Sequence, residues 1–367
     1  MHSLPSPPPA PLRQAIAQAG GWLAFDAYMA LALYAPGWGY YSGERRKFGV
    51  LPQSSSDFVT APELSPHFGR ALARQVAQAL AATGTDEVWE FGAGSGALAR
   101  QLLGQLDASQ LRRYVIVDLS GSLIERQRAQ LAEFADRVQW LQELPASLSA
   151  VVVGNEVLDA MPVKLLARKG GIWHERGVVC SADALAWQDR PTDLRPPVEV
   201  AGVHDYLTEV HAQAQAWVRT LAQRMARGAA FLIDYGFPEA EYYHPQRHMG
   251  TVMCHQAHKA DTDPLVQVGQ KDITAHVDFT GIALAGQDAG WQVLGYTSQA
   301  HFLMNCGLLE GMADAPLAER VMLQKLIHEH EMGELFKVIG FAADTRVCPY
   351  DGWQAVGFAA GDRSHAL

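Results

Sequence analysis

A run of glycines after an apolar stretch is the first feature of this sequence that can carry chemistry. Glu90-Phe-Gly-Ala-Gly-Ser-Gly96 places an acid before three glycines at alternating positions. Glycines between a strand and a helix let the backbone approach a ligand closely at the helix N-terminus. The segment also matches the dinucleotide pattern G-x-G-x-x-A, with Ala97 in the last position and the acidic Asp118 about twenty residues further on. We therefore expect a polar or anionic ligand at this loop, with NAD as one candidate.

Two acidic side chains favour S-adenosylmethionine (SAM) over NAD. The carboxylate of Glu90 would repel a pyrophosphate, but it would attract the ammonium and sulfonium of SAM. Asp118 ends the next apolar run and can accept hydrogen bonds from both ribose hydroxyls. Trp140 follows a third apolar run and can stack on adenine, or else belong to the core. The alternative for both acids is that they cap helices or face solvent. The expected SAM-binding residues are Glu90, Gly92, Ala93, Gly94, Gly96, Asp118, Leu119, Trp140 and Asn155.

A second polar cluster follows the apolar run Ala150 to Gly154. It reads Asn155-Glu-Val-Leu-Asp159, and ligands of a parallel sheet meet the residues that follow the strands. Glu156 and Asp159 are three residues apart, so they share one face if the segment is helical. Two carboxylates and the amide of Asn155 suit a guanidinium, whose planar fork of N–H donors binds carboxylates bidentately. The alternative is that the two acids are the N-cap and first turn of a helix.

Histidines gather in the segment between residues 235 and 280, together with tyrosines, glycines and prolines. A histidine of near-neutral pKa can take the proton that a nitrogen loses on methylation. The candidate base is His276, and Tyr242-Tyr-His244, His255 and His258 are further candidates, although each histidine can also be an ordinary loop residue. The pairs His244/His248 and His255/His258 have no carboxylate or cysteine regularly spaced with them, so we predict no metal. The candidate catalytic residues are Glu156, Asp159, Asn155 and His276.

The elements that must position these residues alternate between short apolar runs and helical patterns. This alternation predicts an α/β fold with a parallel, Rossmann-like sheet covered on both faces. We expect strands at Glu87–Phe91, Tyr114–Asp118, Val138–Trp140, Ala150–Gly154 and Ala229–Asp234. Residues 292–302 and 336–341 are expected to close the sheet, with a helix at about 316–332 between them.

Segments outside this alternation are expected to cover the core. Residues 1–11 are rich in proline and serine and are expected to form a disordered tail. Residues 12–85 are interpreted as a helical N-terminal cap, and 86–367 as the cofactor-binding core. A β-rich flap is expected at about 163–203, followed by a helix from about Tyr206 to Arg227. A second insertion, at about 235–280, is too irregular to be expected in the core.

Composition excludes several classes of function. The 367 residues, 49% of them hydrophobic, can bury a large core. A net charge of -10 provides no positive field for nucleic acid or anionic lipid. The four cysteines form no C-x-x-C pair, and the apolar runs are too short to cross a membrane. The N-terminus has no apolar signal segment. We expect a cytoplasmic protein with no nucleic-acid partner and no membrane insertion, while the oligomeric state stays open.

Seven longer motifs resemble the MidA-like family of SAM-dependent methyltransferases. The match runs from about Gly21 to Val338, nearly the whole chain. The motifs are Pro36-Gly-Trp-Gly-Tyr-Tyr41, Asp57-Phe-Val-Thr-Ala-Pro-Glu-Leu-Ser-Pro66, Glu90-Phe-Gly-Ala-Gly-Ser-Gly96, Gly154-Asn-Glu-Val-Leu-Asp-Ala-Met-Pro162, Ile233-Asp-Tyr-Gly236, Asp272-Ile-Thr-Ala-His-Val-Asp-Phe279 and Met332-Gly-Glu-Leu-Phe-Lys-Val338.

The resemblance implies a class I methyltransferase fold with a seven-stranded sheet, SAM at Gly92 to Gly96 and Asp118, and a substrate cleft covered by the N-terminal and inserted segments. The mitochondrial member of the family is a protein arginine methyltransferase that assists the assembly of respiratory complex I. The implied acceptor is therefore an arginine of a protein, such as a complex I subunit. The chain departs from the family pattern at Ser54-Ser-Ser56, where a glycine is expected. A small-molecule N- or O-methyltransferase and a SAM-binding assembly factor without catalysis remain as alternatives.

Overall fold

Seven strands form the central sheet in the order β15-β16-β10-β5-β2-β3-β4, and the short β14 pairs with β10 beside this path. The computed structural model describes residues 7–42, 60–181, 184–256, 259–310, 312, 316–343 and 353–367. Strands β2 to β5 and β10 are parallel, whereas β16 is antiparallel to β10 and β15. The bounds are β2 (Glu87–Phe91), β3 (Arg113–Val117), β4 (Val138–Leu141), β5 (Leu148–Asn155), β10 (Met225–Phe237), β14 (Val277–Asp278), β15 (Gln292–Ser298) and β16 (Phe336–Ala342).

The order of the strands reverses next to β2. Numbered along the chain, the seven strands lie in the order 3-2-1-4-5-7-6, so the first strand, β2, has the fourth, β5, as one of its neighbours. In an open α/β sheet, ligands bind outside the carboxyl ends of the strands at such a switch point. The glycine loop and the Asn155–Asp159 cluster follow these two strands, and both therefore reach the same crevice.

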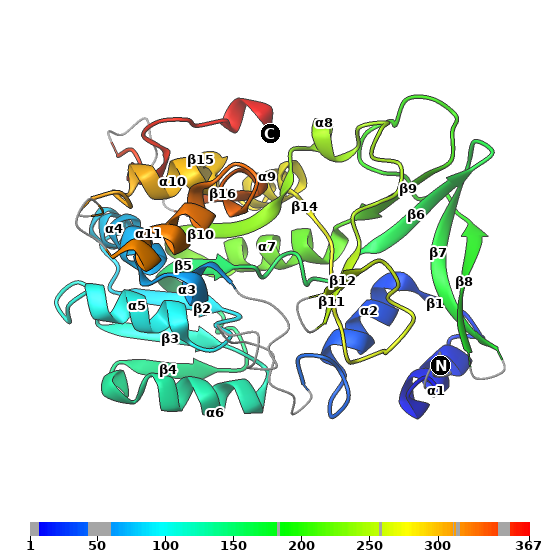
Figure 1. Ribbon diagram of the computed structural model, residues 1–367, viewed down its shortest axis with the longest axis horizontal. Helices are drawn as coiled ribbons and strands as arrows, with labels where there is room; N and C mark the ends of the chain where they lie inside the picture. The colour runs from blue at the N-terminus through cyan, green and yellow to red at the C-terminus, as the bar shows by residue number, and fades with distance from the viewer. Residues whose placement is uncertain are drawn as a thin grey trace.

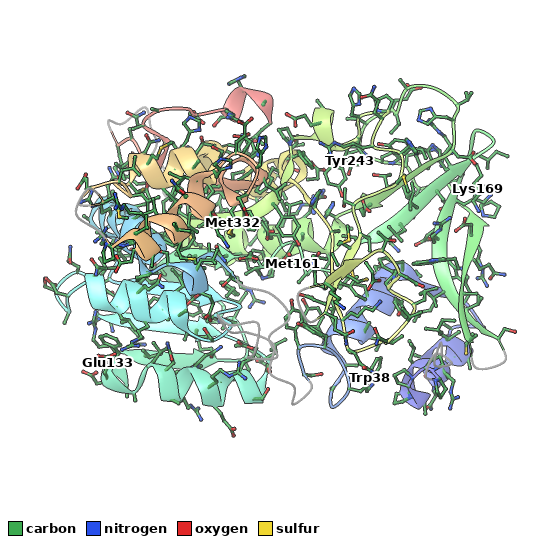
Figure 2. The ribbon with its side chains drawn as sticks, viewed as in Figure 1. Trp38, Glu133, Met161, Lys169, Tyr243 and Met332 are labelled. Atoms are coloured by element: carbon green, nitrogen blue, oxygen red, sulfur yellow. The ribbon has the colours of Figure 1, made fainter. Side chains whose placement is uncertain are left out.

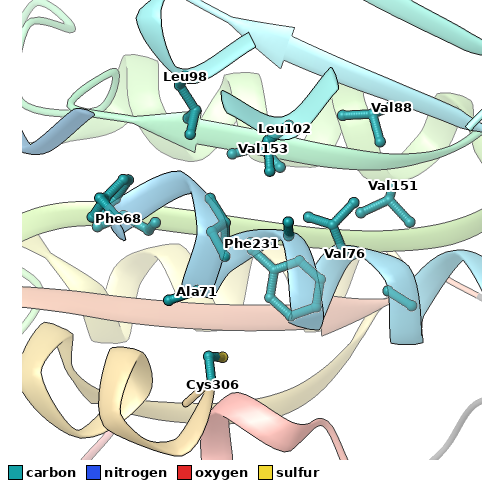
Figure 3. Packing of buried hydrophobic residues seen from close by; sticks show 14 of the residues in the cluster. Phe68, Ala71, Val76, Val88, Leu98, Leu102, Val151, Val153, Phe231 and Cys306 are labelled. Atoms are coloured by element: carbon teal, nitrogen blue, oxygen red, sulfur yellow. The ribbon is translucent and has the colours of Figure 1, made fainter. Parts of the chain in front are cut away.

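Helices cover both faces of this sheet, which explains why its strands are apolar without interruption. Helices α4 (Pro66–Thr83), α5 (Ala97–Gln105) and α10 (Gln299–Asn305) pack on one face, where Val76 and Leu102 lie against Val153 and Phe231 (Figure 3). Helices α7 (Ala212–Arg224) and α9 (Phe279–Asp288) pack on the other face, which Val152 joins. The α/β fold and its seven-stranded sheet are therefore as predicted.

A second, antiparallel sheet lies beside the core, on the right in Figure 1. Its order is β1-β7-β6-β9, with β8 paired to β7. Helices α1 (Ala10–Gln18) and α2 (Phe25–Tyr34) pack on this sheet around Tyr28, Leu165 and Val178. The inserted β-rich flap predicted at about 163–203 is thus a sheet. The bounds are β1 (Leu23–Ala24), β6 (Lys164–Lys169), β7 (Ile172–Ser181), β8 (Ala184–Pro191) and β9 (Tyr206–Val210).

Residues 206–210 form a strand, although the sequence analysis expects the next helix to begin there. Strand β9 pairs antiparallel with β6, and helix α7 begins at Ala212. The aromatic and β-branched residues Tyr206, Thr208 and Val210 suit a strand better than a helix. Glu209 of this strand is buried, and its Oε1 accepts a hydrogen bond of 2.7 Å from the backbone N–H of Thr251.

The segment 235–280 contains buried structure, contrary to the expectation that it lies outside the core. Strands β11 (Met253–Gln256), β12 (Lys259–Asp261) and β13 (Asp272–Thr274) form a small sheet, and α8 (Glu239–Tyr242) precedes them. Cys254, Ile273 and Ala275 belong to the same apolar cluster as α1 and α2. Strands of three or four residues are too short to show a hydrophobic period, so the pattern hides them.

The N-terminal segment contributes to both parts of the molecule. Helix α1 begins at Ala10, inside the stretch expected to be a disordered tail, and residues 1–6 of that tail lie outside the described residues. Helices α1 and α2 contact the second sheet, whereas α3 (Ala61–Leu64) and α4 contact the core. The division of the chain into domains stays a prediction. Figure 2 shows Met161, just beyond β5, between the two parts.

The C-terminal helices complete the core. The helix expected at about 316–332 is present as α11 (Leu317–Ile327), and the short α12 (Met332–Leu335) leads into β16. Within the described part of the chain, no helix is both long and apolar enough to cross a membrane.

Candidate active site

A cavity of about 700 Å³ lies at the carboxyl ends of β2, β3 and β5. This volume is in the range of sites that enclose a small molecule. The N-terminal segment and α7 also contribute to its walls. The predicted site residues that line it are Glu90, Gly92, Ala93, Gly94, Asp118, Leu119, Asn155 and Glu156. The predicted residues that are not among the lining residues are Gly96, Trp140, Asp159 and His276.

The glycine loop turns sharply between β2 and α5. Gly92, Gly94 and Gly96 have φ angles of 62°, 53° and 88°, which residues with a Cβ rarely adopt. A Cβ added at Gly92 would lie 3.3 Å from Cγ2 of Val157, so the loop also fits closely against the turn after β5. Gly96 is the N-cap of α5 and acts through the shape of the loop rather than through contact with a ligand.

Glu90 places a buried carboxyl group on the cavity wall. The side chain is 3% exposed, and the hydroxyl of Tyr114 donates a hydrogen bond of 2.7 Å to its Oε2. Burial raises the pKa of Glu90 to about 7, although the bond from Tyr114 opposes the rise and the nearby Asp118 adds to it. A cation beside this group favours its ionised form. Glu90 is therefore suited to an ammonium ligand.

Asp118 is held at the end of β3 by hydrogen bonds to both of its oxygens. Oδ1 accepts the backbone N–H of Ser120 at 2.9 Å, and Oδ2 accepts the side-chain amide of Gln127 at 2.8 Å. A carboxylate oriented in this way has two acceptor oxygens, as a pair of ribose hydroxyls requires. The predicted ribose contact is compatible with this geometry.

Trp140 is not among the residues that line the cavity, and of its two predicted places, on adenine or in the core, the structure shows the second. Its Nε1 donates a hydrogen bond of 3.0 Å to Oε1 of Gln127, and its ring packs against the core. Trp140 lies within β4, where side chains point to the faces of the sheet that helices cover. The residues that reach the cavity come after the end of this strand, at Gln142, Glu143 and Leu144.

The turn after β5 presents Glu156 to the cavity through an unusual backbone conformation. Glu156 has a φ of 54°, and its N–H donates to the carbonyl of Ile233 at 2.9 Å. The residues after it form a turn, so both the shared helical face and the alternative of a helix N-cap are wrong. Asn155 Nδ2 donates to Glu156 Oε1 at 3.0 Å, and the backbone N–H of Ala61 also donates to the carboxylate. Burial, reinforced by Asp159, raises the pKa of Glu156 to about 8.

Asp234 holds this turn in place from the end of β10. Its Oδ2 accepts the backbone N–H groups of Leu158 and Asp159 at 2.9 and 3.2 Å. Asp159 is not among the residues that line the cavity, although it is predicted to bind the acceptor there; its Oδ2 accepts the hydroxyl of Tyr235 at 2.5 Å instead. Burial raises the pKa of Asp159 to about 6, and burial together with the charge of Asp159 raises the pKa of Asp234 well above its usual value. Asp234 and Asp159 thus hold the backbone turn that carries Glu156.

Comparison with known proteins identifies the cofactor of this cavity. A family model for S-adenosyl-L-methionine-dependent methyltransferases matches residues 71–297, more than half of the chain. The chain belongs to this family. A solved structure from Burkholderia thailandensis with bound S-adenosyl-homocysteine is 50% identical, covers 100% of both chains and superposes with a TM-score of 0.92. The MidA-like resemblance and SAM as the cofactor are thereby confirmed.

More distant relatives of this methyltransferase carry names that specify an acceptor. A Drosophila melanogaster protein named mitochondrial protein arginine methyltransferase NDUFAF7 homolog is 28% identical, with 90% of this chain and 84% of the relative covered. A Caenorhabditis elegans protein of the same name is 25% identical over 78% of this chain and 74% of the relative.

The residues of the methyltransferase cavity fit SAM. Glu90 offers the cationic amino-acid part an anionic partner, and Asp118 offers the ribose two acceptor oxygens. Leu119 lines the cavity and is 73% exposed, which gives a flat apolar ring a surface to cover. The NAD alternative is therefore not favoured, because the buried Glu90 is where a pyrophosphate would approach the glycine loop.

Two tyrosines of the N-terminal segment line the methyltransferase cavity, and the sequence analysis does not name them. Tyr34 and Tyr41 stack with ring centroids 5.4 Å apart, and Tyr41 donates its hydroxyl to both oxygens of Asp272, at 3.0 and 2.9 Å. Tyr41 and Asp272 lie within two of the motifs shared with the MidA-like family, so the motifs could have pointed to them. The same holds for Asp234 and Tyr235, which lie in the motif Ile233-Asp-Tyr-Gly236.

The predicted histidines do not come together at the cavity. The His276 ring lies edge-on to Tyr235 at 5.2 Å and to Phe237 at 5.3 Å, and burial lowers its pKa to about 4. His255 lies on β11, away from the lining residues, and His244 Nδ1 accepts the backbone N–H of Gln246. His258 is outside the described residues. Among the residues that the structure describes, no group of three His, Cys, Asp or Glu side chains is placed to hold a metal ion.

Proposed function

We propose that this methyltransferase transfers a methyl group to a guanidinium nitrogen of an arginine in a protein. The observation that carries this proposal is the buried Glu156 carboxyl beside the cofactor loop, with a pKa raised to about 8. Burial is the largest cause of this rise, and the neighbouring acid Asp159 is the next. A buried acidic group of this kind favours a positively charged partner. The names of the Drosophila and Caenorhabditis relatives support the same acceptor.

The part of the cavity beside Glu156, where the methyl acceptor is proposed to bind, presents oxygen atoms that accept hydrogen bonds. Oδ1 of Asn155 is buried and has no hydrogen-bond partner in the described structure, and Asn155 lines the cavity beside Glu156. A guanidinium has five N–H donors and no acceptor, so it matches a carboxylate and an amide oxygen together. A hydroxyl or carboxylate substrate would leave more of these acceptors unpaired.

The residues of this chain have distinct roles in the proposed reaction. When bound, SAM would supply an electrophilic methyl group, and its sulfur would keep the electron pair of the S–CH3 bond that breaks. Asn155 and Glu156 orient the guanidinium so that one nitrogen faces the methyl group, and orientation of this kind supplies much of the rate. The bound guanidinium cation favours the ionised form of Glu156, and one carboxylate oxygen of Glu156 then takes the N–H proton that the nitrogen loses when its bond to carbon forms. Asp234, Tyr235 and Asp159 keep the Glu156 turn in position.

The test is the substitution Glu156→Gln, which keeps the shape of the side chain but removes the group that can accept the proton. We expect SAM affinity within about threefold of the wild type and a loss of turnover of at least about a hundredfold, the scale of one general base. Exposed Glu133, which pairs with Arg100 on the surface, provides the control variant Glu133→Gln. Transfer of labelled methyl from SAM into a cell lysate measures turnover, and titration calorimetry measures affinity. Unchanged turnover in Glu156→Gln would remove this residue from the reaction.

The identity of the acceptor protein and the compartment remain proposals. We propose a subunit of respiratory complex I as the acceptor, following the MidA-like resemblance, and the cytoplasm as the site of action. Mass spectrometry of the labelled lysate proteins tests the first proposal. Methylarginine on a complex I subunit would support it, whereas methyl groups only on lysine, on hydroxyls or on small molecules would overturn it.

A further inference from the structure

Tyr34 presents an open aromatic surface at the acceptor end of the cavity. It is 39% exposed and lines the cavity, whereas its neighbours Tyr28 and Leu33 on α2 are fully buried. We propose that the ring of Tyr34 is the platform on which the acceptor guanidinium stacks, and that Tyr41 and Asp272 fix its position. This inference rests on the proposed function, because it assumes a guanidinium acceptor.

Hydrogen bonding ties Tyr34 to the turn that carries Glu156. The hydroxyl of Tyr34 donates to the carbonyl oxygen of Ala160 at 2.9 Å, and Ala160 also lines the cavity. Tyr34 ends α2, which packs on β6, β7 and β13, so this hydrogen bond connects the second sheet to the turn after β5. The ring and the Glu156 carboxyl therefore belong to walls of the same cavity that are held together.

Tyr41 covers one face of the Tyr34 ring. The two rings are stacked, with an angle of 17° between their planes. Tyr40 contacts Tyr41 edge-on at 5.0 Å, and the hydroxyl of Tyr41 donates to both oxygens of Asp272. With one ring face covered by Tyr41, a ligand can stack only on the opposite face of Tyr34.

The nearby acids strengthen the attraction of a cation to this surface. Desolvation of the Tyr34 hydroxyl, which is bonded to Ala160, raises the pKa of Tyr34 above its usual value although the residue is partly exposed, and the negative charges of Asp272 and Asp159 add to the rise. The same field that disfavours a phenolate favours a cation over the ring. A planar guanidinium can stack flat on tyrosine and direct two N–H donors of its edge to Glu156, whereas an ammonium has no plane to stack and no bidentate fork. Tyr34 is therefore expected to select arginine over lysine.

The variants Tyr34→Leu and Tyr34→Phe separate the ring from its hydroxyl. Leu removes the aromatic face, and Phe keeps it but loses the bond to Ala160. The control is Trp187→Leu on β8, because Trp187 is a similarly exposed aromatic side chain, at 37%, that does not line the cavity. The probes are Nα-acetyl-arginine amide and Nα-acetyl-lysine amide. Their binding is measured by calorimetry on the full chain saturated with S-adenosyl-homocysteine, whose own affinity reports whether the variant is folded.

We expect the wild type to bind the arginine probe more tightly than the lysine probe. Tyr34→Leu should weaken binding of the arginine probe about tenfold, whereas Tyr34→Phe and Trp187→Leu should change it by less than about threefold. If the wild type binds the arginine probe and Tyr34→Leu binds it equally well, the platform is refuted while the proposed function stands. If the wild type shows no preference for the arginine probe, the guanidinium acceptor fails, and the platform fails with it.

Discussion

Glu90 should make SAM binding depend on pH. Its pKa is raised to about 7 in the protein without ligand, so its carboxyl group is largely neutral below that pH. A cationic ligand favours the carboxylate, so binding below about pH 7 releases a proton. Affinity should therefore rise with pH up to about 7 and then level off. At about pH 5.5 only about 3% of the carboxyl is ionised, which predicts an affinity about 30-fold below the plateau, or about 2 kcal/mol.

Titration calorimetry with SAM between about pH 5.5 and 7.5 measures this effect. The upper limit keeps the ligand's own amino group, whose usual pKa is about 8, in its charged form. Glu156, with a pKa of about 8, stays mostly protonated over the same range and contributes little. Repeating each titration in buffers of different ionisation enthalpy counts the protons released, and we expect close to one per SAM at the acidic end.

Two variants test whether Glu90 is the group responsible. Glu90→Gln should bind weakly at every pH and lose the dependence. Tyr114→Phe removes the hydroxyl that stabilises the Glu90 carboxylate, so the pKa of Glu90 should rise further and the midpoint of the affinity curve should move to higher pH. An affinity that is flat across the range in the wild type, or an equal slope in Glu90→Gln, would refute the reasoning.

Two further predictions follow from the geometry of the cavity. Asp234→Asn keeps one acceptor oxygen but directs an amide N–H towards backbone N–H donors. Turnover should therefore fall more than about tenfold, while SAM affinity stays within about threefold of the wild type. A parallel loss of turnover and affinity would show general misfolding instead. Leu119→Ala should weaken SAM binding several-fold without lowering the melting temperature, because the side chain is exposed and lines the cavity. Trp140→Leu should instead lower the melting temperature and leave SAM affinity within about twofold. Calorimetry and thermal melts measure the two effects, and the opposite pattern would place Trp140 at the adenine site.

The cofactor half of the site is predictable from local sequence because its chemistry is local. The glycine loop and Asp118 each follow a continuous apolar strand, and the carboxyl ends of parallel strands meet at one edge. This reasoning fails at Trp140, which lies two residues before Gln142, the first residue after β4 that lines the cavity. The hydrophobic pattern does not show where the strand ends. A residue at the end of the strand faces a covering helix, whereas a residue in the loop just after it faces the ligand.

The acceptor half depends on contacts between residues far apart in the chain, and periodicity does not predict these. Asp159 has the right type and spacing for a second acceptor ligand, yet Tyr235 from β10 turns it away from the cavity. The positive φ of Glu156 replaces the expected helix by a turn, and it is held by Ile233 and Asp234 from another strand. Tyr34 reaches this site from α2, more than a hundred residues earlier.

The placement of α2 on the second sheet separates two kinds of evolutionary change. Tyr34 belongs to a helix that rests on β6, β7 and β13, whereas the glycine loop belongs to the central sheet. With the role proposed for Tyr34, substitutions that shift α2 on its own sheet would change which acceptors bind, while the cofactor loop stays on the central sheet. Exchange of residues 10–42 and the second sheet between relatives is thus a route to methyltransferases that share a donor and differ in target.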